Sequence, residues 1–265
     1  MSRAGGRAGD GPPRGLLLDL DGTVYEGDAL VPGADRAIAA LREDGVPVRF
    51  VTNTTRVPCA TIAGWLQDYG VPAVPDDIFT PPRAAATWLA ERGLRRLALC
   101  LPEVSFGEFS GAEIVDRQPE AVVVGDLGPA WTFDVMNRAF RWILDGAGLV
   151  ALHRNRYWKT GGQLVLDAGA FVAALEYATG REATLVGKPS GPMFEAAARS
   201  MGLPLADVAM VGDDLEADIG GSQALGIRGF MVRTGKYRNT ELERSEIEPD
   251  RVIDSVASLP ALLRG

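Results

Sequence analysis

Short apolar segments alternate with segments of helical periodicity along most of the chain. Residues 15–20 predict a buried strand, and residues 46–52 predict the next one. Between them, Ala34, Ile38 and Leu41 recur at the spacing that places side chains on one face of a helix. A strand, a helix and a second strand within about 38 residues form a βαβ unit, so we expect the two strands to run parallel.

The same alternation continues towards the end of the chain. It predicts further helices at residues 58–69, 82–92, 132–145, 169–179, 192–201 and 215–225. It predicts further strands at residues 96–100, 121–125, 149–153, 184–187, 208–212 and 227–232. Such an order favours an α/β fold with a parallel sheet and helices on both of its faces.

The composition is that of an ordinary globular protein. Of 265 residues, 46% are hydrophobic and 23% are charged, and this length allows one large domain or two smaller ones. The net charge of −8 argues against nucleic acid as a partner, because binding to a phosphate backbone needs clustered Lys and Arg. No apolar run approaches the roughly 18 residues of a membrane span. We therefore expect a cytoplasmic protein without a membrane partner.

Two local features support this location. Residues 1–14 are polar and rich in glycine, which predicts a disordered leader and not a signal peptide. Cys59 and Cys100 are the only cysteines, and they lie far apart in the sequence. This excludes a disulfide framework and a zinc site of paired cysteines, and it favours two buried, reduced thiols.

Most familiar catalytic motifs are absent. Gly187-Lys188 and Gly235-Lys236 resemble the end of a P-loop but lack its earlier glycine and the Ser or Thr that follows the lysine. No dinucleotide-binding glycine motif follows a predicted strand, no nucleophile elbow is present, and His153 is the only histidine. A hydrolase with this sequence must therefore use carboxylates.

Polar side chains gather where predicted strands end. They are Asp19 and Asp21, Thr52 and Asn53, Lys188, and Asp213, Asp214 and Asp218. Taken singly, an Asp-x-Asp-Gly segment is a common turn, and a lysine after a strand is commonly solvated. In an open parallel sheet, however, ligands bind at the carboxyl ends of the strands. The coincidence at four strand ends therefore predicts one binding site.

The residue types at these strand ends indicate a particular chemistry. Several converging carboxylates repel one another unless a cation lies between them. Magnesium prefers a few carboxylates, waters and a substrate phosphate as ligands. A lysine and a threonine hydroxyl can hold the remaining phosphate oxygens. The pattern therefore predicts a magnesium-dependent centre for phosphoryl transfer.

The ordered set of motifs resembles the four motifs of the haloacid dehalogenase superfamily. It comprises Asp-Leu-Asp-Gly-Thr-Val from Asp19, Thr52-Asn53, Gly187-Lys188-Pro189, and Gly212-Asp213-Asp214 with Asp218. The resemblance implies a Rossmann-like, doubly wound catalytic core formed by residues 15–82 and 183–265. It implies an inserted α/β cap domain of the C2 type at residues 83–182, and a homodimer formed through that cap.

The resemblance also implies a role for each motif residue. Asp19 is the expected nucleophile, which forms an aspartyl-phosphate, and Asp21 is the expected general acid and base. Magnesium is expected on Asp19, Asp213 and the main-chain carbonyl of Asp21. Thr52, Asn53 and Lys188 are expected to hold the phosphoryl group. Asp214 and Asp218 are expected to orient Lys188 or a metal-bound water.

Two residues outside the motifs are candidates for substrate contact. They are Arg56 and His153, and His153 begins a basic, aromatic segment at residues 153–159. A solvated basic turn packed on Trp158 explains this segment equally well. The expected substrate is a small phosphorylated compound, either a phosphate monoester, pyrophosphate or a compound with a P–N bond.

Two other functions are compatible with the motifs. A catalytically silent, phosphoryl-binding regulatory protein is the main alternative, although the intact pair Asp19 and Asp21 disfavours it. A dehalogenase would share Asp19 but would leave Asp21 and Asp213 without a purpose.

Overall fold

The computed structural model describes residues 11–160 and 162–264, so residues 1–10 of the predicted leader lie outside the described part. Contacts between residues divide the chain into two compact units. The core unit comprises the described residues of Met1–Thr52, Ala60–Phe79 and Phe194–Gly265. The inserted unit comprises Asn53–Cys59 and Thr80–Met193. The role of the inserted unit as a C2 cap stays a prediction.

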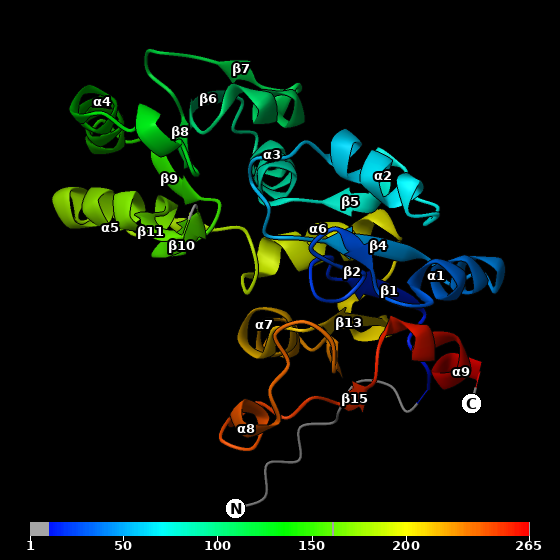
Figure 1. Cartoon of the computed structure of the whole chain (residues 1–265). Helices are drawn as coiled ribbons and strands as arrows, with labels where there is room; N and C mark the ends of the chain where they lie inside the picture. The colour runs from blue at the N-terminus through cyan, green and yellow to red at the C-terminus, as the bar shows by residue number, and fades with distance from the viewer. Residues whose placement is uncertain (1–10, 161, 265) are drawn as a thin grey trace, which may run out of the picture. The chain divides into compact units, whose positions relative to one another are not determined.

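The core unit contains a parallel sheet of six strands in the order β15-β14-β13-β1-β4-β5 (Figure 1). The strands are β1 (Gly15–Leu18), β4 (Val48–Val51), β5 (Ile78–Phe79), β13 (Val208–Gly212), β14 (Arg228–Val232) and β15 (Arg251–Ile253). Every residue of β1 and β13 is buried. Because successive side chains of a strand point to opposite faces, both faces of the sheet are covered, as predicted.

Some helices of the core unit lie where the periodicity predicted them, namely α1 (Ala34–Glu43), α2 (Cys59–Asp68) and α6 (Gly191–Ser200). The core unit also contains α7 (Gly221–Gln223), and α8 (Asn239–Leu242) and α9 (Leu259–Arg264), which were not predicted. α1 buries Ala34, Ile38 and Leu41, as expected, and it contacts β4 and α9. A hairpin of β2 (Tyr25–Glu26) and β3 (Ala29–Leu30) was not predicted, because strands of two residues leave no period-two pattern.

The predicted helix at residues 215–225 was wrong as a single regular helix. Residues Leu215–Gly220 form a π-helical segment, and α7 continues it for only three residues. Asp214 caps the segment by accepting hydrogen bonds from the main-chain amides of Glu216 and Ala217. The wider turn brings the side chain of Asp218 back to the end of β13, where its Oδ2 accepts a bond of 3.2 Å from the amide of Asp214.

The inserted unit contains a second parallel sheet, of five strands in the order β12-β9-β8-β6-β7. The strands are β6 (Arg96–Cys100), β7 (Glu113–Ile114), β8 (Ala121–Val124), β9 (Gly148–Ala151) and β12 (Thr184–Leu185). Its helices are α3 (Pro81–Glu91), α4 (Phe133–Leu144) and α5 (Ala168–Thr179). One buried cluster joins the sheet to α4 and α5, and another joins it to α3. The predicted α/β fold is thus confirmed in both units.

Two features of the inserted unit correct the sequence-based expectations. The strand before Lys188, β12, pairs with β9 and belongs to this second sheet, so the four strand-end motifs do not share one sheet. A local sequence pattern does not show which strands distant in sequence pair with each other. A hairpin that was not predicted, of β10 (Tyr157–Thr160) and β11 (Gln163–Leu166), includes the end of the basic segment, whereas Arg154 and Arg156 precede it and are exposed.

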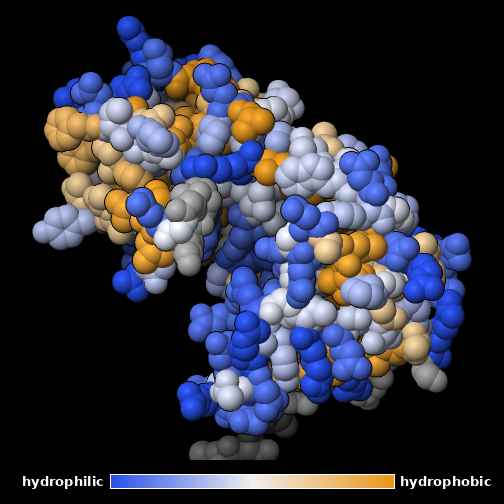
Figure 2. Space-filling model, viewed as in Figure 1, coloured by the Kyte–Doolittle hydropathy of each residue, from blue (hydrophilic) through white to orange (hydrophobic). Residues whose placement is uncertain are grey.

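Large apolar side chains are exposed on the inserted unit. They include Phe133 of α4, Leu164 and Leu166 of β11, and Tyr177 of α5. Figure 2 shows hydrophobic surface in the region of these elements. Exposed apolar surface of this kind is compatible with association, but the homodimer stays a prediction. Among the described residues, no helix combines the length and the apolar character that crossing a membrane requires.

Candidate functional site

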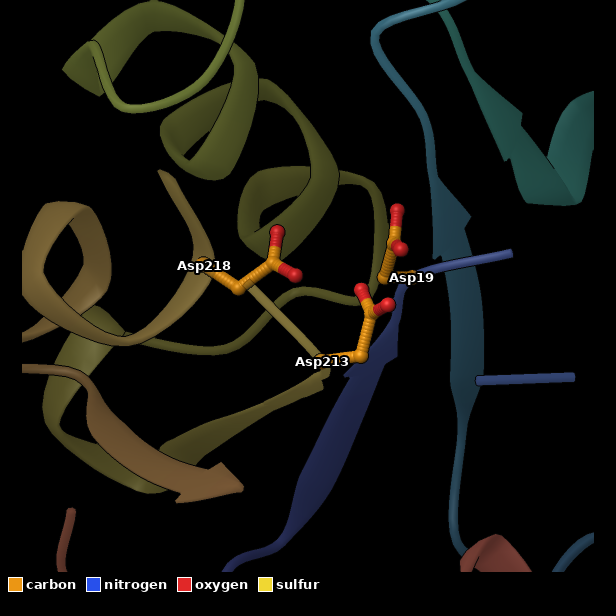
Figure 3. Close-up of side chains that lie close together, drawn as sticks. All are labelled: Asp19, Asp213 and Asp218. Atoms are coloured by element: carbon orange, nitrogen blue, oxygen red, sulfur yellow. The ribbon is translucent and has the colours of Figure 1, made fainter. Parts of the chain in front are cut away.

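Three buried aspartates converge at the carboxyl end of the core sheet (Figure 3). Asp19 directly follows β1, Asp213 directly follows β13, and Asp218 comes from the π-helical segment. One carboxylate oxygen of each lies within 4.8 Å of those of the other two. β1 and β13 are neighbours in the sheet, and the amide of Asp19 donates a bond of 2.9 Å to the carbonyl of Val211. Adjacent parallel strands thus bring Asp19 and Asp213 together, as the sequence predicted.

Asp218 takes a more central position than the sequence indicated. Sequence reasoning gave it a supporting role, whereas the structure makes it the third member of the carboxylate group. The side chain of Asp21, in contrast, is exposed. Carboxylates at this spacing are suited to bind one divalent cation through oxygen.

Glycines leave room for these carboxylates. Gly22 and Gly235 both have positive φ, and a Cβ on either one would overlap Oδ2 of Asp213. A Cβ on Gly22 would also lie 2.6 Å from Cγ of Asp213. A Cβ on Gly212 would overlap the carboxylate of Asp218. Glycine is therefore required at these positions to let the two aspartates approach the end of the sheet.

The electrostatics of Asp213 favour a cation beside its carboxylate. Burial raises the pKa of Asp213. The main-chain amide of Lys236 acts to lower this pKa by donating a hydrogen bond of 2.8 Å, whereas the negative charge of Asp218 raises it further. Within the part of the chain that the structure describes, the buried Oδ1 of Asp213 accepts no hydrogen bond. A buried carboxylate oxygen of this kind needs a metal ion or a donor to offset its desolvation.

Lys236 also lies in this region, although its sequence resembled only the end of a P-loop and did not indicate a site residue. Its ammonium lies 2.9 Å from Oδ2 of Asp214. Burial acts to lower the pKa of Lys236, but the hydrogen bond with Asp214 and the charges of Asp214, Asp213 and Asp19 outweigh it and raise the pKa. The available signal was its place shortly after β14, the strand beside β13.

Asp21 and Thr52 complete the candidate residues of the core unit. Asp21 pairs with Tyr25 at an isolated bridge next to the β2–β3 hairpin. Burial, followed by the charges of Asp21 and Asp19, raises the pKa of Tyr25 to about 12. Thr52 is buried after β4, and its amide donates a bond of 3.0 Å to the carbonyl of Phe79. The core unit thus carries its predicted site residues at the ends of β1, β4 and β13.

The inserted unit joins two of the predicted motifs. The side-chain amide of Asn53 donates a bond of 2.9 Å to the carbonyl of Lys188, and the amide of Lys188 donates one of 2.9 Å to Oδ1 of Asn53. Lys188 is buried, with 5% of its surface exposed. Gly187 is required beside this pair, because a Cβ there would lie 2.9 Å from Oδ1 of Asn53.

The two predicted substrate contacts outside the motifs interact with acids of their own unit. Arg56 forms an ion pair of 2.6 Å with the buried Asp126. His153 is buried, and its Nε2 lies 3.6 Å from Oδ1 of Asp167. Burial lowers the pKa of His153, although the charges of Asp167 and Asp126 oppose the shift. Contact of Arg56 and His153 with substrate stays a prediction, and the side chains of residues 158–160 lie outside the described ones.

Both cysteines are buried free thiols, as predicted. Burial raises the pKa of each thiol to about 12, and the nearby Glu108 adds to the shift at Cys59. Neither side chain is therefore a reactive thiolate near neutral pH.

Comparisons with known proteins cover nearly the whole chain. A family model described as "Haloacid dehalogenase-like hydrolase" matches residues 16–108, and one described as "HAD-hyrolase-like" matches residues 185–259. Haloacid dehalogenase-like hydrolase domain-containing protein 2 of Pongo abelii is 40% identical over 89% of this chain and 90% of its own length. Phospholysine phosphohistidine inorganic pyrophosphate phosphatase of Bos taurus is 36% identical over 94% of each chain.

Solved structures share the fold of this chain. The 4-nitrophenylphosphatase of Thermotoga maritima has a TM-score of 0.85 and 29% identity, and the match covers 95% of this chain and 97% of that one. The p-nitrophenyl phosphatase of Archaeoglobus fulgidus has a TM-score of 0.86 and 27% identity, with 95% and 100% covered.

Proposed function

This chain belongs to the haloacid dehalogenase-like hydrolase family, and we propose on that premise that it is a magnesium-dependent phosphatase of small phosphorylated substrates. The observation that carries the proposal is the convergence of Asp19, Asp213 and Asp218 at the carboxyl end of the core sheet. The names of the bovine relative and of both solved structures, all phosphatases, support the reaction class.

The residues at this position fit a magnesium ion. Asp213 has a buried oxygen without a hydrogen bond in the described part of the chain, and the donor set consists of the oxygens that magnesium prefers. Asp19, Asp213 and the main-chain carbonyl of Asp21 would hold the ion. When bound, the ion would offset the negative charge of the carboxylates and stabilise charge on the phosphoryl oxygens.

Asp19 is the proposed nucleophile. Its carboxylate oxygen attacks phosphorus in line with the leaving oxygen or nitrogen, and a phosphoryl–oxygen bond to Asp19 forms as the bond to the leaving group breaks. Asp21 donates a proton to the leaving group in this step. Asp21 then accepts a proton from the water that attacks the aspartyl-phosphate, so that phosphate leaves and Asp19 is restored. The exposure of Asp21 gives it the access to solvent that this second step needs.

The remaining motif residues bind the phosphoryl group in this proposal. The Thr52 hydroxyl, the Asn53 main chain and the Lys188 ammonium would hold its oxygens and offset their charge. The paired hydrogen bonds between Asn53 and Lys188 support this role, because they restrict the main chain that carries the ammonium. Asp218, whose carboxylate lies beside those of Asp19 and Asp213, would orient a water bound to the ion, and Asp214 would orient Lys188 or such a water.

Hydrolysis of 4-nitrophenyl phosphate tests the proposed function. We expect turnover that requires magnesium, stops with a chelator and returns when magnesium is restored. Asp19→Asn should lower kcat at least about 1,000-fold, since it removes the nucleophile. Asp254→Asn, which removes an exposed carboxylate of the core unit, should retain activity.

A substrate labelled in its phosphoryl group distinguishes the proposed covalent mechanism from simple binding of phosphate. A chain quenched in acid during turnover should retain covalent label, and Asp19→Asn should retain none. Phosphate binding without turnover would instead support the silent regulatory alternative. Turnover that persists in Asp19→Asn, or in chelator, would contradict the proposed mechanism.

A further inference from the structure

The core unit contains an aromatic pocket of about 320 Å³. It is lined by Tyr25, Gly27 and Asp28 of the β2–β3 hairpin and by Trp65, Asp68 and Tyr69 at the end of α2. The rings of Tyr25 and Tyr69 lie 6.1 Å apart between centroids, with an angle of 33° between their planes. The pocket thus combines three aromatic side chains with two carboxylates.

The two carboxylates of this pocket have no positively charged partner among the described residues. Among the described residues, neither the carboxylate of Asp28 nor that of Asp68 forms an ion pair or accepts a hydrogen bond. Asp68 is also the last residue of α2, where the helix dipole disfavours a carboxylate. Trp65 leaves 45% of its surface exposed beside these acids. A cation is therefore the ligand that both the carboxylates and the ring faces would stabilise.

Tyr25 links this pocket to the segment that carries Asp19 and Asp21. It lines the pocket, pairs with Asp21 at the isolated bridge, and accepts a bond of 2.6 Å from the amide of Gly22 at its carbonyl. Burial raises the pKa of its hydroxyl, and the charges of Asp21 and Asp19 add to the shift. A group in the pocket therefore lies beside the loop that carries the proposed nucleophile and acid.

We propose that the aromatic pocket binds a positively charged alkylammonium group of the substrate's leaving group. The enzyme would then prefer phosphorylated compounds with a cationic leaving group over neutral compounds of the same shape, and over pyrophosphate. This inference rests on the proposed phosphatase function, whose leaving group must lie near Asp21. The carboxylates of Asp28 and Asp68 would repel a second phosphate.

Phosphocholine and 3,3-dimethylbutyl phosphate provide a matched pair of substrates, because they share one shape and differ by one positive charge. We expect kcat/KM to be roughly tenfold higher for phosphocholine. Trp65→Leu and Asp68→Asn should each reduce this ratio to about twofold or less. Glu43→Gln, which removes an exposed carboxylate outside the pocket, should leave the ratio unchanged. A ratio taken within one variant cancels differences in the amount of folded enzyme.

Choline binding supplies a measurement that does not require catalysis. Choline should change the tryptophan fluorescence of the natural protein, and the change should disappear in Trp65→Phe. Equal kcat/KM for the two esters, with 4-nitrophenyl phosphate still hydrolysed, would overturn this inference alone. If none of the three compounds is hydrolysed, the proposed phosphatase function is wrong. The fluorescence measurement tests the pocket separately. A choline response that persists in Trp65→Phe, or that is absent from the natural protein, would overturn binding of the cation in this pocket.

Discussion

Asn53 and Lys188 exchange two hydrogen bonds of 2.9 Å across 135 residues of sequence. One joins the side-chain amide of Asn53 to the carbonyl of Lys188, and the other joins the amide of Lys188 to Oδ1 of Asn53. The asparagine side chain therefore satisfies both main-chain groups of a buried lysine. We therefore propose that Asn53 positions the Lys188 ammonium.

Removal of this side chain should impair catalysis without removing a phosphate ligand. In Asn53→Ala, two hydrogen bonds of about 1 kcal/mol each are lost, while the main chain of Asn53 stays available to the phosphoryl group. We expect kcat/KM for 4-nitrophenyl phosphate to fall roughly tenfold or more. Asn239→Ala, at an exposed asparagine of α8, serves as the control. Unchanged kinetics in Asn53→Ala would contradict the positioning role.

A methyl group on Gly22 should abolish activity because it would overlap the carboxylate of Asp213. Gly45 has a similar positive φ, and a Cβ there would meet nothing within 4 Å. Gly22→Ala and Gly45→Ala should therefore share a backbone cost of about 1 kcal/mol, measured by denaturant unfolding. Only Gly22→Ala should also reduce the rate of magnesium-dependent hydrolysis, by about 100-fold or more, because its methyl group would displace the metal-binding carboxylate of Asp213. Equal activities of the two variants would show that the overlap is relieved.

Asp213 should make the metal-free protein less stable as pH rises. Its folded pKa is raised, so the proton bound to it stabilises the folded chain at low pH. This stabilisation is lost as the pH rises from below the ordinary pKa of an aspartate towards the raised pKa of Asp213 in the folded protein. We expect the Tm of Asp213→Asn, relative to that of the natural protein, to increase from pH 4 to pH 7 in chelator.

Magnesium should reverse this difference near neutral pH. An ion that binds only the folded state raises its Tm, and Asp213→Asn should respond much less to added magnesium. Asp254→Asn should respond like the natural protein. A magnesium response that Asp213→Asn retains in full would place the metal elsewhere.

Much of the candidate site could be predicted because it depends on local pattern. Asp19 and Asp213 directly follow apolar runs that form buried strands, and the ends of adjacent parallel strands meet at one edge. Lys236 and Asp218 were harder to place. The position of Lys236 follows from the pairing of β14 with β13, and that of Asp218 follows from the π-helical segment.

The sequence by itself determined the alternation of strands and helices and the order of the polar residues at the strand ends, because both arise from residues that are neighbours along the chain. The tertiary structure alone decided that β12 joins the sheet of the inserted unit, that Asn53 holds Lys188, and that three aromatic rings and two carboxylates form a pocket. The physical reason is that strand pairing, burial and charge proximity depend on contacts between distant segments. A local pattern of residues does not contain them.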